Sequence, residues 1–497
     1  MSSMWLVGER LAPQTGYLRP FIGLVTLLAS QSLLQTAWYY FGGLLGARSD
    51  AFSLGIPLLL FFVWNFWQKA PANEEPLPST SLTQFVAEAR WSIPLLLTGE
   101  ALLGLVLLLA HGAATTQAIN SPWPLLPAGV LAAIFLLSLA TWIAGRRVRH
   151  TLTIAVCVGT FLFSVSALTP LIYTHGFGFD GFLLFLSELV LGTTGTLTPK
   201  PPYYLGQYVF VTWLERIAGI SIPLIDRWLV PVFAGLLPLF AIAKTTRPGA
   251  RWSLVLLGAF LPLSIIVTTT PQAFAYLLGL AALFYAWELR NNTSLETPAP
   301  LITIVPALLL AGWSLATHPL AGLPLAAATA GILWHDLSIT RSWPTQLRRA
   351  GLISIAFFAS IGVPLAFAIN SQLSTHHIDW HLERLGETAV WREIGAQLVS
   401  QPLSHLALWP DWTDITSWLT RCFILTGIIV ALWRKEPGRE KRIFLTATSV
   451  GLSGAAILLA QTGEFTFLIG YERGNYAERL SLLAILVILP VIIYGWS

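Results

Sequence analysis

Long apolar runs, bounded by charged residues or prolines, recur along almost the whole chain. Most are about 17 to 25 residues long, the length at which an α-helix crosses the hydrocarbon core of a bilayer. The sequence lacks the alternating apolar and polar segments of transmembrane β-strands, so helices are predicted. About fourteen spans are predicted, near residues 21–44, 51–68, 93–113, 123–144, 151–172, 223–243, 252–270, 272–289, 300–317, 319–335, 349–370, 413–433, 443–461 and 479–496. The predicted fold class is an all-α polytopic membrane protein.

Two stretches between the fifth and sixth spans have a different pattern. In residues 180–191, the polar residues share one side of a helix, and leucine and phenylalanine cover the rest. In residues 203–217, the polar positions fall on one helical stripe: Tyr204, Gln207, Tyr208, Thr212 and Glu215. Helices of this kind lie in the membrane interface. We therefore predict two juxtamembrane amphipathic helices in the first large outer loop, with Glu188 and Glu215 on solvated faces.

Positive charges give the predicted spans an orientation. Lysine and arginine gather in short loops after the fourth, sixth, tenth and twelfth spans, at residues 146–149, 244–251, 341–349 and 434–442. The positive-inside rule places such loops in the cytoplasm. The long segments 174–222, 371–412 and 462–478 then lie outside, and both termini lie in the cytoplasm. This pattern predicts a multi-pass protein of the plasma membrane whose chemistry is on the outer face.

The composition supports a membrane location and excludes several other classes. Of the 497 residues, 55% are hydrophobic and 10% are charged, whereas soluble domains carry about 25% charged residues. The net charge of +4 comes from lysines and arginines in loops between spans and not along one stripe, so no nucleic-acid partner is predicted. Cys157 and Cys422 both lie inside apolar runs, which excludes a disulfide framework and a thiolate metal site.

The densest group of chemically useful residues follows the fifth span. Residues 173–181 read Tyr-Thr-His-Gly-Phe-Gly-Phe-Asp-Gly, and residues 198–207 read Thr-Pro-Lys-Pro-Pro-Tyr-Tyr-Leu-Gly-Gln. Asp180 is thus a carboxylate at the mouth of a span, where it can meet a lipid head group. A positioned carboxylate can accept the proton of a hydroxyl that attacks the anomeric carbon of a sugar.

In this region the chain resembles the GT-C superfamily of membrane glycosyltransferases, which includes protein O-mannosyltransferases, aminoarabinose transferases and single-subunit oligosaccharyltransferases. The family pattern is a span, an acidic residue outside it, a juxtamembrane helix, and a Pro-Pro-Tyr-Tyr-like opening to a second juxtamembrane helix. Later positions that match are Gly219, Asp226, Arg227, Lys244 and Arg247. The clear resemblance covers about residues 151–250. It is weaker at 317–320 (Thr-His-Pro-Leu) and at 471–479 (Tyr-Glu-Arg-Gly-Asn-Tyr-Ala-Glu-Arg).

The resemblance implies a GT-C-like fold and an inverting transfer of a sugar from a polyprenyl-phosphate donor. The acceptor would be a lipid, glycan or protein of the cell envelope, at the outer face of the membrane. Residues 151–497 would form the catalytic membrane domain. The first four spans precede the family's usual first helix; we predict that residues 1–150 are an N-terminal accessory four-helix membrane segment, whose role this departure leaves open. Asp180 would match the catalytic acidic residue, as base or as metal ligand. The residues expected to bind substrate are His175, Lys200, Tyr203, Tyr204, His318, Arg473 and Arg479, the arginines because guanidinium binds phosphate in a bidentate way.

Each of these residues also has a structural interpretation that the sequence leaves open. Asp180 is a favoured helix N-cap, and Tyr203 and Tyr204 fit an aromatic belt at the membrane surface. Arg473 and Arg479 could pair with the neighbouring Glu472 and Glu478, and His318 could be a polar residue at a helix end. A divalent metal ion is a weaker alternative: His376, His377 and His381 lie in one outer segment, and His377 and His381 are four residues apart.

Two other function classes compete with the transferase. A transporter or flippase of a lipid-linked glycan needs charged residues along a pathway at the bilayer midplane. Within the predicted spans, Glu100 is nearly the only ionisable residue at depth. The other alternative is a noncatalytic membrane assembly protein, in which the outer loops bind partners and Asp180 is only a cap.

Overall fold

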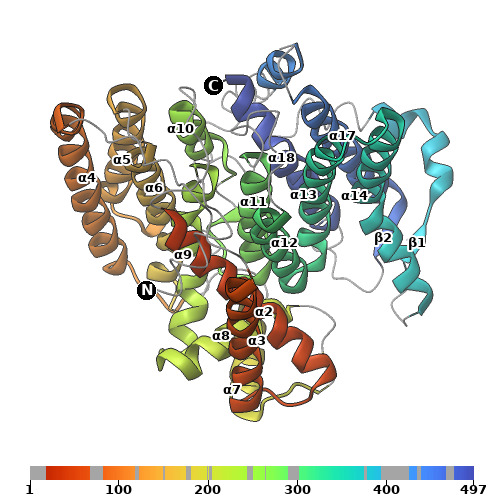
Figure 1. Cartoon of the computed structure of the whole chain (residues 1–497), viewed down its shortest axis with the longest axis horizontal. Helices are drawn as coiled ribbons and strands as arrows, with labels where there is room; N and C mark the ends of the chain where they lie inside the picture. Colours follow the sequence, from red (N-terminus) through yellow and green to blue (C-terminus); the bar gives the residue numbers. More distant parts are fainter. Residues whose placement is uncertain are drawn as a thin grey trace. The chain divides into compact units, whose positions relative to one another are not determined.

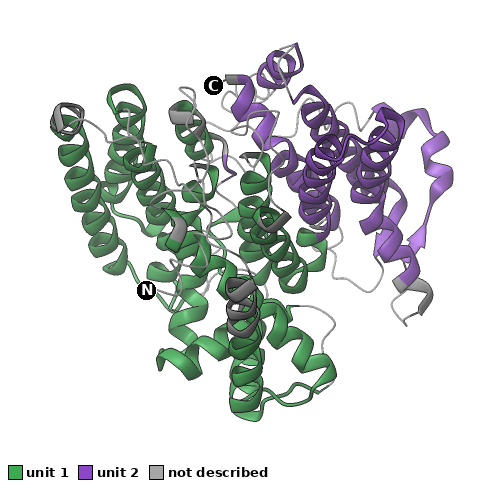
Figure 2. Ribbon diagram, in the orientation of Figure 1, with its two compact units in different colours: residues 1–259, 265–322 green, residues 260–264, 323–497 purple. Residues whose placement is uncertain are grey.

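The structure is a computed structural model, drawn in Figure 1. It describes residues 18–67, 82–117, 123–148, 151–174, 181–198, 200, 204–242, 250–262, 265–288, 301–373, 378–392, 425–433, 438–465 and 475–496. The chain forms two compact units, coloured separately in Figure 2. Unit 1 comprises residues 1–259 and 265–322, and unit 2 comprises residues 260–264 and 323–497. The accessory segment predicted at residues 1–150 concerns function, and this division does not test it.

Unit 1 is built from helices. They are α2 (Arg19–Phe41), α3 (Ala47–Trp67), α4 (Leu82–His111), α5 (Ala128–Arg147), α6 (Thr151–Ile172), α7 (Gly181–Thr194), α8 (Leu205–Ala218), α9 (Ile222–Ile242), α10 (Ala250–Phe260), α11 (Pro271–Glu288) and α12 (Val305–Thr317), with short 3₁₀ helices η2 (Trp123–Leu125) and η4 (Leu301–Ile304). Helix α6 is buried along most of its length and packs against α4, α5 and α9. A side chain at Gly159 would collide with the carbonyl of Gly235 on α9, so a small residue is needed at this crossing.

Unit 2 combines helices with one small sheet. Its elements are most of α13 (Pro319–Thr340), α14 (Thr345–Leu373), β1 (Ile378–Trp380), η5 (Leu382–Gly386), α17 (Arg439–Thr462), β2 (Gly463–Phe465) and α18 (Asn475–Trp496). Strands β1 and β2 pair antiparallel, with Asp379 opposite Glu464. The sequence predicted no strand here. The pairing joins two of the segments predicted to lie outside, 371–412 and 462–478.

Within the described part of the chain, nine helices are long and apolar enough to cross a membrane: α2, α4, α5, α6, α9, α13, α14, α17 and α18. Helix α4 exposes large apolar side chains such as Leu97 and Leu108, which suits contact with lipid and not with water. The chain is therefore an all-α multi-pass membrane protein.

Four other predicted spans correspond to helices α3, α10, α11 and α12. The last three have 11, 18 and 13 residues, and the run predicted at 252–270 is not one helix. Helix α10 ends at Phe260, two residues before Pro262, and Pro271 begins α11. The predicted span 413–433 lies largely outside the described residues. The total of fourteen spans stays a prediction.

Candidate functional site beneath helices α7 and α8

Helices are present at both places where juxtamembrane helices were predicted, but the face that the polar residues occupy was predicted wrongly. Helix α7 covers 181–194 and α8 covers 205–218. Glu188, expected on a solvated face, is fully buried, and so are Gln207 and Thr212 of the α8 stripe; Glu215 is half-buried. The outer surface of α7 instead carries Leu183, Leu186 and Val190. The reason is that a helix bordered by lipid turns its polar residues towards the protein.

Three buried polar side chains, one each from α7, α8 and α9, are hydrogen-bonded to one another. The Gln207 Nε2 amide donates hydrogen bonds to Glu188 Oε1 at 3.0 Å and to Asp226 Oδ1 at 2.9 Å. Exposed fractions are 0% for Glu188, 1% for Gln207 and 6% for Asp226. The contact links α7, α8 and α9, and we call these three residues the carboxyl cluster.

The carboxyl cluster can hold a proton. Burial away from water, together with the nearby Asp226 carboxylate, raises the pKa of Glu188 well above its ordinary range. Two carboxyl groups bonded to one amide cannot both ionise at low cost, so one proton is shared within the pair. Among the described residues, Glu188 Oε2 and Gln207 Oε1 have no hydrogen-bond partner.

Protein stability should depend on pH through Glu188. Its folded-state pKa lies above the ordinary value of 4.5, so above that pH the folded protein keeps a proton that the unfolded chain releases. The stability contribution is complete below pH 4.5 and declines as pH rises towards the folded pKa, by at most about 1.4 kcal/mol per pH unit. Glu188→Gln should therefore flatten the fall in unfolding midpoint as the pH rises above 4.5.

Thermal unfolding in detergent at a series of pH values measures this slope. Glu387→Gln, which removes an exposed carboxylate outside the membrane helices, is the control and should keep the wild-type slope. An unchanged slope in Glu188→Gln would contradict the assignment of the buried proton to this cluster.

Two predicted substrate residues come together although 114 positions separate them. The rings of Tyr204 and His318 lie 5.2 Å apart between centroids. His318 is buried and follows α12, and its Nδ1 accepts a hydrogen bond from the Ala321 amide at 3.3 Å in the first turn of α13. This is the structural role that the sequence left as the alternative for His318. It also leaves the imidazole against the Tyr204 ring.

Tyr204 has an unusual backbone. Its φ of 70° lies in the left-handed region, which a non-glycine residue seldom adopts, and it directly precedes α8. Such conformations persist where surrounding contacts impose them and are frequent at functional sites. Tyr204 also contacts Tyr208 one turn later, at 6.2 Å between ring centroids. Tyr204 is therefore held in one place by the start of α8, by Tyr208 and by His318.

Lys200 is anchored to the end of α2. Its Nζ donates to the Tyr39 carbonyl at 2.8 Å and lies 5.0 Å from the centroid of the Tyr39 ring. The Tyr39 hydroxyl accepts a hydrogen bond from the Leu197 amide at 3.1 Å. These contacts hold the segment before α8 against α2. Lys200 itself remains exposed.

Most of the other predicted site residues lie outside the part of the chain that the structure describes. Asp180, His175, Tyr203, Arg473, His376 and His377 lie outside the described residues, although Asp180 directly precedes the first residue of α7. Arg479 lies in unit 2, with its guanidinium 5.6 Å from the centroid of the Tyr476 ring. Its predicted phosphate contact stays a prediction.

In the described part of the metal candidate in unit 2, the His381 ring lies between two carboxyl groups. His381 Nδ1 lies 3.1 Å from Glu383 Oε1, and Nε2 lies 3.4 Å from Glu464 Oε2. Among the residues that the structure describes, no group of three His, Cys, Asp or Glu side chains is arranged to hold a metal ion.

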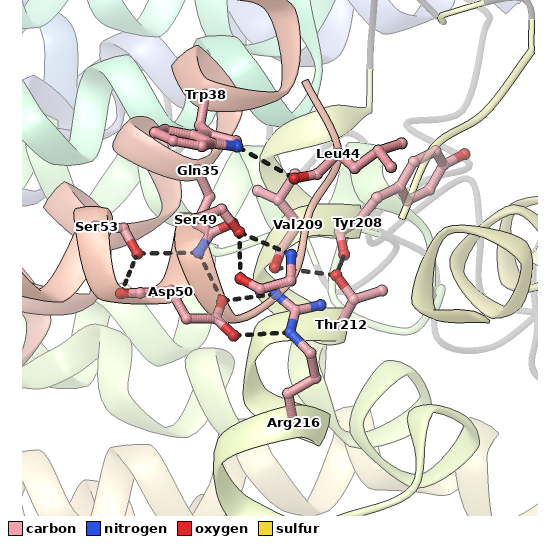
Figure 3. A network of polar contacts seen from close by, with 11 residues as sticks. Gln35, Trp38, Leu44, Ser49, Asp50, Ser53, Tyr208, Val209, Thr212 and Arg216 are labelled. Atoms are coloured by element: carbon pink, nitrogen blue, oxygen red, sulfur yellow. Dashed lines mark hydrogen bonds and ion pairs between the residues drawn. The ribbon is translucent and has the colours of Figure 1, made fainter. Parts of the chain in front are cut away.

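An ion pair that the sequence did not predict joins α8 to α3 (Figure 3). Arg216 donates from Nη2 to Asp50 Oδ1 at 2.7 Å and from Nε to Oδ2 at 2.9 Å. Gln35 Nε2 adds a hydrogen bond to Asp50 Oδ1 at 2.8 Å and one to Ser53 Oγ at 2.9 Å. The network joins α2, α3 and α8. Nothing in the sequence signalled this pair, because 166 positions separate its two members.

Comparison with protein-family models, with curated proteins and with solved structures finds no match for this chain.

Proposed function

We propose that this chain is a membrane glycosyltransferase of the GT-C type. In this proposal it moves a sugar from a polyprenyl-phosphate donor to a cell-envelope acceptor, at the outer face of the plasma membrane. The proposal includes the orientation with both termini in the cytoplasm. The observation that carries it is the packing of α7 and α8. These two consecutive short helices contact each other, and Tyr204, which directly precedes α8, lies against His318.

The geometry around α8 suits the binding of a sugar phosphate. Tyr204 and His318 offer an aromatic face and a polar ring, which together suit a sugar. Lys200, whose Nζ is held by the carbonyl and the ring of Tyr39, offers a positive charge for a phosphate. The exposed leucines of α7 give a lipid tail an apolar surface.

The proposed chemistry is a single displacement. The acceptor hydroxyl oxygen bonds to the anomeric carbon as the bond from that carbon to the phosphate oxygen breaks. Asp180, which directly precedes α7, accepts the hydroxyl proton, and polyprenyl phosphate leaves as an anion near Lys200. Attack from the face opposite the leaving group inverts the anomeric configuration.

Asp180→Asn is expected to lower the rate of transfer at least about 100-fold, because a positioned general base contributes roughly 10² to 10⁴ to the rate. The measurement is transfer of radiolabelled sugar from polyprenyl-phosphate donors by purified protein in lipid, with and without EDTA. Asp379→Asn, an exposed aspartate on β1, is the matched control and should keep wild-type transfer. Wild-type rates in Asp180→Asn, or no turnover by the wild type with a broad donor set, would overturn the proposal.

A second function, proton-coupled movement of a lipid-linked glycan, is favoured by one specific observation. The carboxyl cluster buries Glu188 and Asp226 on one amide, and paired buried carboxyls serve as proton relays in transporters. Glu100, the ionisable residue that the sequence placed at depth, lies within the membrane helix α4 on an exposed face, whereas Glu188 and Asp226 are buried inside the protein. Flipping of a fluorescent lipid-linked glycan in liposomes with a pH gradient separates the two functions. Transport that is lost in Glu188→Gln, with no sugar transfer by the wild type, would favour the transporter.

A further inference from the structure

Helices α14 and α17 of unit 2 enclose a groove of about 550 Å³. Its walls are one face of each helix, with contributing residues three or four positions apart, as on a single helical stripe. From α14 these are Arg349, Leu352, Ile353, Ala356, Phe357 and Ser360, and from α17 they are Glu440, Ile443, Phe444, Ala447 and Gly451. Apart from the arginine and glutamate at one end and a serine at the other, the lining is apolar. The volume is in the range of small-ligand sites.

The groove is narrow at its apolar end. A side chain at Gly451 would collide with the side chain of Ser360, so the two helices come close together there. The Ser360 hydroxyl donates to the Ala356 carbonyl at 2.7 Å within its own helix. Its proton is therefore already hydrogen-bonded without a polar ligand in the groove. From Arg349 to Ser360 helix α14 rises about 16 Å at 1.5 Å per residue, and one leaflet of the hydrocarbon core is about 15 Å thick. The groove therefore has the length of one acyl chain in one leaflet.

The other end of the groove carries surplus positive charge. Glu440 is already bound by Arg348, whose Nε lies 2.9 Å from its Oε2, whereas Arg349 Nε is 3.5 Å from Oε1. Next to this pair, Lys441 Nζ lies 2.7 Å from Asp336 Oδ2. Two arginines and one lysine thus face two carboxylates. Arg349 holds the weakest of these ion pairs, and 66% of its side chain is exposed.

We infer that this groove binds an anionic phospholipid, with one acyl chain between α14 and α17 and the phosphate at Arg349. The length and the apolar lining select an acyl chain, and the surplus cation selects an anionic over a zwitterionic head group. The basic residues 341–349 were predicted on the cytoplasmic side, so the lipid would come from the inner leaflet. This site is independent of the proposed transferase chemistry.

The test is lipid retention by the full-length protein. Protein in nanodiscs of phosphatidylcholine with increasing phosphatidylglycerol is released into the gas phase, and native mass spectrometry counts the lipids that stay bound. Wild type should retain one phosphatidylglycerol in preference to phosphatidylcholine. Arg349→Gln should lower this preference about fivefold, the effect of one arginine near an anionic lipid. Arg341→Gln, an exposed arginine outside the groove, should change nothing.

A variant that fills the groove distinguishes the contribution of its apolar lining to lipid binding from the contribution of Arg349. Ala447→Phe places a ring in the groove, and retention of both lipids at this site should fall together. Val450→Phe adds the same ring on α17 at an exposed position that does not line the groove, and retention should stay at the wild-type level. Soluble glycerol phosphate should not compete if the acyl chain is needed. Equal retention of the two lipids by wild type, or an Arg349→Gln variant with wild-type preference, would overturn the inference.

Discussion

Asp50→Leu is expected to lower the free energy of unfolding by about 3 kcal/mol, because it leaves the Arg216 guanidinium without its carboxylate in a largely buried place. The two side chains are 12% and 21% exposed, so the low end of the range for buried pairs applies. The leucine also removes the acceptor of the Gln35 amide. Thermal or detergent-induced unfolding of purified protein measures the change.

A double-mutant cycle shows whether the ion pair is responsible. Arg216→Leu alone should also destabilise, because it strands the Asp50 carboxylate. The double variant Asp50→Leu/Arg216→Leu should recover much of the loss, since no buried charge remains. If the two single losses simply added, the pair in Figure 3 would not be coupled. Because the pair holds α8 to α3, both single variants should also lose sugar transfer before they unfold globally.

The positions of most membrane helices could be predicted from the sequence because hydrocarbon selects them residue by residue. Helix α6 has the predicted bounds, 151–172, and α9 differs from its prediction by one residue at each end. Helix α13 continues five residues beyond its predicted end at 335. The sequence shows a histidine and an aspartate there, which normally end an apolar run. The lysine that neutralises Asp336 lies 105 positions away, on α17, so no local pattern could reveal it.

The candidate site was harder to predict than the helices. The stripe on α8 was visible in the sequence, but a stripe does not say which face meets the protein. In water the polar face turns outwards, whereas beside lipid it turns inwards, and Glu188 and Gln207 follow the second rule. The partner that decides this is Asp226 on α9, which the sequence connects to neither residue. The contact between Tyr204 and His318 joins two residues that had each been predicted as substrate ligands, without any sign that they were neighbours.

Gly206→Ala should have an effect as large as loss of the ion pair, about 3 kcal/mol, because α8 cannot move to make room for a methyl group. A Cβ at this position would lie 2.6 Å from both the amide nitrogen and the hydroxyl oxygen of Thr317 on α12. The Gly206 carbonyl is fixed from two other sides, by Ser32 Oγ at 2.8 Å and by Trp313 Nε1 at 2.9 Å. These bonds hold the backbone of α8 against α2 and α12.

The same substitution tests whether the packing of α8 against α2 and α12 matters for function. Gly206 lies between Tyr204 and Gln207, so a shift of the backbone separates Tyr204 from His318 and weakens the bonds of Gln207 to both carboxyls. Gly104→Ala on α4 is the control, since nothing lies within 4 Å of its Cβ and alanine favours a helix. Unfolding midpoints and sugar transfer should both fall for Gly206→Ala and stay at wild-type values for Gly104→Ala. A Gly206→Ala protein with wild-type stability would mean that α8 and α12 are not in close contact, and the Tyr204–His318 pair would then lose its structural support.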